Sequence, residues 1–177
     1  LDLLPENQTS TSKENHRFSR LYLPGNSPSL MLNAGVHKPN GLILDLEDAV
    51  APDKKHEARF LVRNALRSLN FYGAERMVRI NQGKQGLEDL DFVIPHGVNL
   101  ILVPKVEAPE QLVAVDQKIK KLQLEHGLKN PVWLMPIIES AKGVMQAFQI
   151  AKATTTVSSM AIGLEDYTAD MGVRRTA

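Results

Sequence analysis

Short apolar runs recur along the chain, and each one ends in polar or charged residues. The clearest is Val-Trp-Leu-Met-Pro-Ile-Ile-Glu-Ser at 132–140, in which Glu139 follows the apolar residues. Runs this short, and partly β-branched, are typical of strands buried on both faces of a parallel sheet. The pattern predicts six strands, at residues 20–25, 41–47, 76–81, 99–105, 132–139 and 159–163.

Between these runs the apolar residues recur at helical spacing. In residues 54–69, Ala58, Leu61 and Ala65 fall on one face, as expected of a helix that packs against a sheet. A short helix is expected to follow the first strand, with Asn26 or Ser27 as its cap. The expected helices cover residues 26–34, 54–69, 87–94, 108–127 and 142–153, and residues 167–177 are expected to be loop or the start of a further helix.

Strands and helices alternate in units of roughly 25–30 residues, which indicates a parallel βα architecture. No G-x-G-x-x-G follows a strand and no Walker loop is present, so dinucleotide-binding and P-loop folds lose their main support. Polar residues end many different strands, as in a TIM (β/α)8 barrel, whose active site is built from strand ends. A full barrel takes about 250 residues. We therefore expect an α/β fold of the TIM-barrel type, with about the first six βα units in this chain.

Two regions are expected within the chain. Residues 1–16 are polar and are predicted to form a flexible N-terminal arm. Residues 17–177 are predicted to form the barrel domain, incomplete at its C-terminal side. A six-stranded open barrel exposes two sheet edges. We therefore expect either further residues that complete the barrel or a homo-oligomer, a trimer or hexamer, that covers the gap.

Composition narrows the classes of function. The 177 residues carry a formal net charge of +1, which gives no bulk electrostatic reason to bind nucleic acid or a membrane surface. The absence of cysteine excludes disulfides, thiolate metal ligands and cysteine nucleophiles. No apolar run approaches the ~18–20 residues of a membrane span, and the N-terminal residues do not resemble a secretory signal. A cytoplasmic protein with a small-molecule substrate is expected.

Six short motifs stand at the predicted strand ends in a fixed order. In this order and spacing the chain resembles the citrate lyase β-subunit-like family, which includes malyl-CoA lyases and related HpcH/HpaI-type aldolases, over residues 17–176. One such motif is weak, but six in order are specific for the superfamily, and much less so for the substrate. The motifs are Leu21–Asn26, Leu44–Val50, Val78–Asn81, Val103–Lys105, Ile138–Ser140 and Gly163–Asp166.

The resemblance implies a Mg²⁺-dependent carbon–carbon lyase. Such an enzyme cleaves or forms a 3-hydroxyacyl thioester of the citryl-CoA or malyl-CoA type, with an acetyl-thioester and a 2-oxo acid such as oxaloacetate or glyoxylate as the other side of the reaction. The residues that match the family's metal ligands are Glu139 and Asp166. Arg79 matches the arginine that holds the oxo acid, and Glu47 and Asp48 match an acidic pair near the metal-bound waters.

The resemblance also implies contacts to the rest of the substrate. In CoA-dependent members, basic residues near the first strand hold the nucleotide, and here Arg17 and Arg20 flank that position, although the usual Arg-Ser pair is absent. The thioester carrier, CoA or an acyl-carrier protein, stays open. Gly163 permits close backbone approach, so the amides of Leu164 and Glu165 can contact the carboxylate of the oxo acid.

These residue types suit that chemistry. Mg²⁺ prefers oxygen ligands, keeps several waters and is often held by one or two carboxylates plus substrate. As a Lewis acid it stabilises charge on a keto oxygen, and an arginine fork matches a carboxylate in bidentate fashion. Structural roles remain open for several residues: Glu47 and Asp48 can be structural, Asp45 can pair with a base inside the barrel, and Lys105 can merely brace the barrel mouth.

Two other functions remain open. One is a non-catalytic or accessory subunit of a lyase complex that keeps the metal site, and the other is an aldolase that acts on free 2-oxo acids. A lyase needs a general acid or base, and no residue of the sequence is an obvious candidate. In the resembling family this carboxylate comes from a C-terminal region that can reach a neighbouring subunit.

Overall fold

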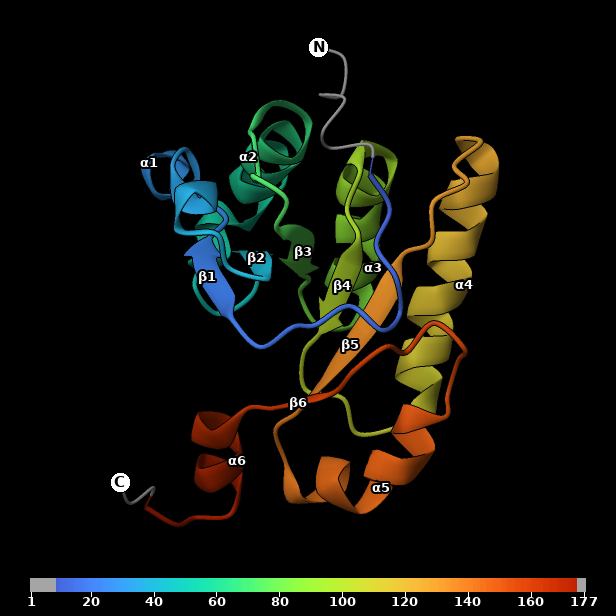
Figure 1. Cartoon of the computed structure of the whole chain (residues 1–177). Helices are drawn as coiled ribbons and strands as arrows, with labels where there is room; N and C mark the ends of the chain where they lie inside the picture. Colours follow the sequence, from blue (N-terminus) through green and yellow to red (C-terminus); the bar gives the residue numbers. More distant parts are fainter. Residues whose placement is uncertain (1–8, 175–177) are drawn as a thin grey trace.

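Six parallel strands form the centre of the computed structural model, which describes residues 9–174 (Figure 1). All six predicted strands are confirmed, although each is one to three residues shorter than expected. Each strand pairs with the next one along the chain. The strands are β1 (Arg20–Pro24), β2 (Gly41–Asp45), β3 (Glu75–Arg79), β4 (Leu100–Val103), β5 (Trp133–Ile138) and β6 (Ala161–Ile162).

Helices follow the strands, as the helical spacing predicts. The third helix begins four residues earlier than expected, because Gly83 rather than Leu87 opens it, and a further helix occupies part of the predicted tail. Ser27 stands at the start of the first helix, but its side chain makes no capping hydrogen bond. The α-helices are α1 (Pro28–Met31), α2 (Lys55–Ser68), α3 (Gly83–Val93), α4 (Pro109–Glu125), α5 (Ala141–Ala151) and α6 (Leu164–Asp170), and 3-10 turns are η2 (Ala34–His37), η3 (Pro52–Lys54) and η4 (Ile94–His96).

Alternate strand residues face two separate apolar cores. Leu42, Val78 and Ile101 belong to the larger core, which also holds the buried faces of α2, α3 and α4. Neighbouring side chains point to the opposite face of the sheet. There they form a smaller core of Ile43, Met77, Leu100, Leu102, Met135 and Ile137. The sheet is therefore a curled half-barrel with helices outside; the expected α/β fold with parallel strands is confirmed, whereas a full TIM barrel is not.

The inward-facing positions change from apolar to charged along β2 and β3. On β2 the inward positions are Ile43 and Asp45, and Glu47 lies two residues beyond the end of the strand. On β3 they are Met77 and Arg79, and the strand register sets Arg79 beside Asp45. The apolar positions pack the interior, so the charged ones gather where the strands end.

The N-terminal end of the half-barrel is closed by residues 9–16. The carbonyl of Thr9 accepts hydrogen bonds from Arg76 and Asn99, and Thr11 donates to Glu75 and accepts from the indole N–H of Trp133. These contacts join residues 9–16 to the starts of β3, β4 and β5, while the flexible arm over residues 1–16 and the barrel domain over residues 17–177 stay predictions. Residues 1–8 of that predicted arm lie outside the described residues.

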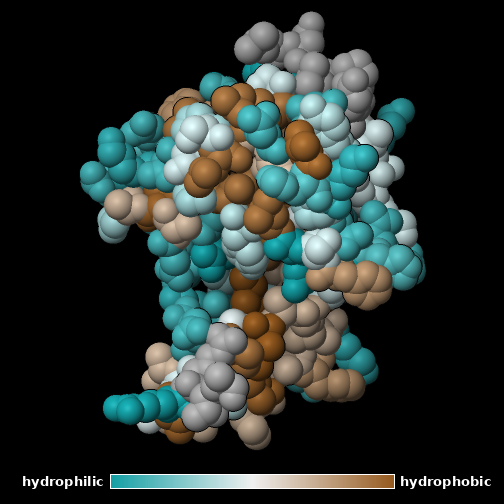
Figure 2. Space-filling view, turned by 60° about the vertical axis from the view of Figure 1, so that its left-hand side comes forward, coloured by the Kyte–Doolittle hydropathy of each residue, from teal (hydrophilic) through white to brown (hydrophobic). Residues whose placement is uncertain are grey.

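Apolar side chains remain exposed near the end of the described chain. Met145 and Phe148 of α5 are 83% and 66% exposed, and Ile162 of β6 is 54% exposed. Figure 2 shows apolar atoms at the surface among the hydrophilic ones. Within residues 9–174, none of the helices has the length and apolar character needed to cross a bilayer.

Candidate active site

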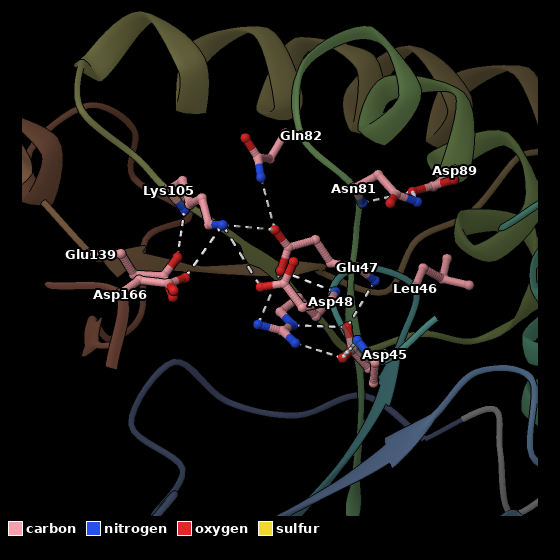
Figure 3. A network of polar contacts seen from close by, with 12 residues as sticks. Asp45, Leu46, Glu47, Asp48, Asn81, Gln82, Asp89, Lys105, Glu139 and Asp166 are labelled. Atoms are coloured by element: carbon pink, nitrogen blue, oxygen red, sulfur yellow. Dashed lines mark hydrogen bonds and ion pairs between the residues drawn. The ribbon is translucent and has the colours of Figure 1, made fainter. Parts of the chain in front are cut away.

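Charged residues from four segments meet at the carboxyl ends of the strands. Glu47 and Asp48 follow β2, Lys105 follows β4, Glu139 follows β5 and Asp166 lies in the first turn of α6. Figure 3 shows Lys105 between Glu139 and Asp166 on one side and Glu47 and Asp48 on the other. The structure therefore brings together the acidic residues that the sequence singled out.

Arg79 is held in this cluster by two carboxylates. Its Nε and Nη2 donate to the two oxygens of Asp45 at 2.8 and 2.6 Å, and its Nη1 lies 3.1 Å from Glu47 Oε2. Burial alone would lower the pKa of the Arg79 guanidinium. The hydrogen bonds and the charge of Asp45 outweigh this effect and raise the pKa of Arg79 above its ordinary value. The prediction that Asp45 pairs with a base inside the barrel is confirmed.

Glu47 is almost fully buried beside this pair. Its Oε1 accepts a hydrogen bond from Gln82 Nε2 at 2.9 Å, and its backbone N–H donates to Asp45 at 2.9 Å. Burial raises the pKa of the Glu47 carboxyl, while the Gln82 hydrogen bond and the charge of Arg79 act in the opposite direction. A buried carboxylate with these neighbours is fixed in orientation and favours a nearby cation.

Glu139 is fixed from two sides. Its Oε2 accepts the backbone N–H of Lys105 at 2.9 Å. A Cβ placed on Gly163 would lie 2.3 Å from Glu139 Oε1, so only glycine leaves room for the carboxylate there. Burial raises the pKa of the Glu139 carboxyl, and the charges of Asp166 and Glu47 raise it further. The glycine that the sequence analysis assigned to close backbone approach thus accommodates this side chain.

The Lys105 ammonium shows that this cluster suits a cation. Its Nζ lies 3.3 Å from Asp166 Oδ2, 3.8 Å from Asp48 Oδ2 and 3.9 Å from Glu47 Oε1. Within residues 9–174, no three acidic or histidine side chains are grouped closely enough to hold a metal ion by themselves. Mg²⁺ needs no such group, because it commonly uses one or two carboxylates together with waters and substrate. Glu139 and Asp166 fit that requirement.

Arg17 and Arg20 lie at the other end of the strands. All five N–H groups of Arg17 are used inside the protein, in two contacts to Glu75 and in bonds to the carbonyls of residues 12, 13 and 15. Arg20 begins β1 and directs Nη1 toward the sulfur of Met135 at 3.4 Å. The structure therefore does not bring either arginine to the acidic cluster, and the contacts of Arg17 leave it no donor for a substrate.

Leu164 and Glu165 lie in the first turn of α6, directly after Gly163. The first N–H groups of a helix have no acceptor within the helix itself. Leu164 and Glu165 lie beside Glu139 because the preceding residue, Gly163, donates its N–H to the carbonyl of Ile138 at 2.9 Å. The turn is thus held against the end of β5, where the sequence analysis expects the carboxylate of an oxo acid.

Sequence reasoning missed Gln82, which links β3 to Glu47. The signal was available, since Gln82 directly follows the Val-Arg-Ile-Asn motif at a strand end. It also underrated Lys105, whose ammonium and backbone N–H both contact the cluster. Neither role could be assigned from spacing, because each depends on a residue at least 34 positions away.

The fold and this site together define a class of protein. Helices cover one face of a parallel half-barrel, and an acidic cluster with a buried arginine lies at the carboxyl ends of its strands. This is the arrangement of α/β-barrel proteins whose functional site is built from strand ends and the loops that follow.

A family model described as HpcH/HpaI aldolase/citrate lyase matches residues 19–177, and the chain belongs to this family. Citrate lyase subunit beta of Haemophilus influenzae is 34% identical over 163 residues, which cover 90% of this chain and 56% of that protein. An L-malyl-CoA/beta-methylmalyl-CoA lyase of Cereibacter sphaeroides is 32% identical, over 89% of this chain and 51% of that protein. The chain spans about half the length of the curated relatives it matches.

Solved structures show the same fold. The CitE protein of Mycobacterium tuberculosis in complex with magnesium and acetoacetate has a TM-score of 0.70 and 27% identity, over 91% of this chain and 61% of that one. A second structure of that protein, with magnesium, acetoacetate and coenzyme A, has a TM-score of 0.71 and 26% identity, over 92% of this chain and 55% of that one. The resemblance stated from the six motifs is confirmed.

Proposed function

We propose that this chain carries the metal- and oxo-acid-binding part of a Mg²⁺-dependent carbon–carbon lyase that acts on a 3-hydroxyacyl thioester. The observation that carries the proposal is the convergence of Glu139, Asp166 and Arg79 at one end of the half-barrel. Support comes from the relatives named as citrate lyase beta and malyl-CoA lyase, and from the magnesium in the CitE complexes.

Each residue has a role in this proposal. Glu139 and Asp166 would hold Mg²⁺, which when bound supplies Lewis acidity to the keto oxygen of the oxo acid. Glu47 and Asp48 would accept hydrogen bonds from the waters of the ion. Two of the five N–H groups of Arg79 donate to Asp45 and Nη1 is ion-paired with Glu47, so the terminal nitrogens keep further N–H groups to hold a carboxylate.

The fixed geometry would serve the reaction. Glu139, Glu47 and Arg79 are each held by contacts to the protein before any substrate arrives. Groups that need no reorganisation stabilise developing charge best. The amides of Leu164, Glu165 and Asp166 would hold the oxo-acid carboxylate from the side of α6. The product pair would be an acetyl-thioester and oxaloacetate or glyoxylate, with CoA or an acyl-carrier protein as the thioester carrier.

Calorimetry with Mg²⁺ and oxaloacetate or glyoxylate tests the site directly. We expect the unmodified chain to bind the pair, and Glu139→Gln and Asp166→Asn each to weaken binding by tenfold or more, because each removes a charged oxygen ligand. Glu57→Gln, an exposed carboxylate of α2, is the matched control and should leave the affinity unchanged. Equal affinity in all three variants would show that Glu139 and Asp166 do not hold the ion.

Turnover assays separate the lyase from the two other functions considered. Cleavage of citryl-CoA or malyl-CoA with Mg²⁺ supports the proposed lyase. Metal-dependent cleavage of a free 4-hydroxy-2-oxo acid without any thioester supports an aldolase instead. These assays use the full-length protein, because a lyase needs a general acid or base and the residues of this chain offer no obvious candidate. In that protein, binding of Mg²⁺ and oxo acid without turnover of either substrate supports an accessory subunit that keeps the metal site.

A further inference from the structure

Lys105 combines an unusual backbone with a side chain that points into the acidic cluster. Its φ is 49°, in the left-handed region that non-glycine residues seldom occupy. Such a conformation persists only where the surroundings hold it, and it gathers at functional sites. The position directly after Pro104, at the end of β4, places Lys105 between the end of β2 and the end of β5.

The loop after β4 holds Lys105 in this conformation. The carbonyl of Lys105 accepts a hydrogen bond from Gln111 Nε2 at 3.4 Å, and Gln111 Oε1 accepts the N–H groups of Glu107 and Ala108 at 2.7 and 2.9 Å. The N–H of Lys105 donates to Glu139 at 2.9 Å. The strained backbone thus orients one proposed metal ligand while the ammonium contacts the other, Asp166.

The charges of the cluster do not balance without a further cation. Arg79 is paired with Asp45 and Glu47. The flexible four-carbon side chain of Lys105 brings its ammonium to the remaining carboxylates. Like charges at this spacing repel, and partial burial strengthens the repulsion. Five carboxylates, Asp45, Glu47, Asp48, Glu139 and Asp166, stand against the side chains of Arg79 and Lys105 and the ammonium of Lys55, which donates to the carbonyls of Leu46 and Glu47.

We infer that Lys105 is an internal counter-ion that neutralises the proposed metal site before the ion binds and competes with the ion for it. The inference rests on the proposed Mg²⁺ site. The guanidinium of Arg79 is fixed by three contacts, whereas the Lys105 side chain is 37% exposed and can turn into solvent when a divalent ion arrives. If Lys105 only braced the mouth of the barrel, its ammonium would not compete with the metal ion.

Titration with Mg²⁺ alone tests the competition. We expect Lys105→Met to bind Mg²⁺ on the order of tenfold more tightly than the unmodified chain, because one nearby positive charge is removed. In EDTA the same variant should have a lower Tm, because the carboxylates repel one another without their counter-ion. Lys84→Met, at a 92% exposed position of α3, is the control for the loss of one charge and should match the unmodified chain.

Lys105→Arg keeps the charge and should retain both the Tm in EDTA and the Mg²⁺ affinity within about threefold. If the unmodified chain binds Mg²⁺ and Lys105→Met binds it no more tightly, or if the Tm of Lys105→Met in EDTA equals that of Lys84→Met, the counter-ion role is wrong and the metal site stands. If neither the unmodified chain nor Lys105→Met binds Mg²⁺, either alone or together with oxaloacetate, the proposed metal site fails, and the counter-ion role fails with it.

Discussion

At the scale of single residues, the same side chain can serve the fold and the site. Arg79 is 14% exposed, and its partner Asp45 is 1% exposed. Removing one partner of such a pair leaves the other charge buried and uncompensated. Arg79 therefore stabilises the half-barrel as well as offering its remaining N–H groups to an oxo acid.

Arg79→Lys should lower both stability and ligand affinity. Lysine keeps the charge but cannot contact both oxygens of Asp45 in one plane, so we expect a loss of about 2–3 kcal/mol in the free energy of unfolding. Oxaloacetate binding in the presence of Mg²⁺ should weaken by about 1.5–3 kcal/mol, the range for a hydrogen bond to a charged group. Urea denaturation and calorimetry measure the two effects.

Arg67→Lys, in the last turn of α2, is the control for this substitution and should change neither quantity by more than about 0.5 kcal/mol. A stability loss without a loss of oxo-acid affinity would assign Arg79 to the fold alone. Unchanged stability would show that the pair with Asp45 contributes little in solution.

At the scale of elements, the junctions between strands and the helices that follow them place the proposed metal ligands. Glu139 directly follows β5, and the next residue, Ser140, caps α5 by accepting the N–H of Gly143 at 3.1 Å. The Ser140 hydroxyl also donates to Glu107 in the loop after β4, which is the loop that holds Lys105. One serine thus joins the two loops on either side of the cluster.

Ser140→Ala should cost about 1 kcal/mol in the free energy of unfolding, because the first turn of α5 loses its cap. Ser27→Ala is a matched control, since Ser27 occupies the same position before α1 without a capping hydrogen bond and should cost only a few tenths of a kcal/mol. Urea denaturation of the two variants measures the difference. Equal losses would show that the Ser140 hydrogen bond does not contribute to stability.

At the scale of the whole molecule, the two ends of the half-barrel have separate tasks. The carboxyl ends carry the acidic cluster, and the opposite end is closed by residues 9–16 with the Arg17–Glu75 pair, whose side chains are 5% and 2% exposed. The expected homo-oligomer, a trimer or hexamer, and the cytoplasmic location stay predictions. The exposed apolar side chains of α5 and β6 are compatible with a further contact there.

Arg17→Lys tests this separation of tasks. We expect a loss of about 3 kcal/mol in the free energy of unfolding, because most of the hydrogen bonds of a buried ion pair are lost. The affinity of the folded protein for Mg²⁺ and oxaloacetate should not change. Urea denaturation and calorimetry give both values, and weaker substrate binding at unchanged stability would favour the substrate role that the family resemblance implies for Arg17.

The sequence by itself determined the order of the strands, the placement of helices between them and the residue types at the strand ends. These follow from local periodicity and from short motifs, which need no knowledge of distant contacts. Glu139, Asp166, Arg79, Glu47 and Asp48 were found in this way, and the structure gathers them at one edge of the sheet.

Only the tertiary structure decided which partners these residues have. The register of β2 and β3 selects Asp45 as the partner of Arg79, and the loops after β3 and β4 bring Gln82 and Lys105 to Glu47. Arg17 matched a binding role by its position before β1, yet its partner Glu75 lies 58 residues away. Such pairs join segments far apart in the sequence, and their choice depends on strand register and loop conformation, which local patterns do not encode.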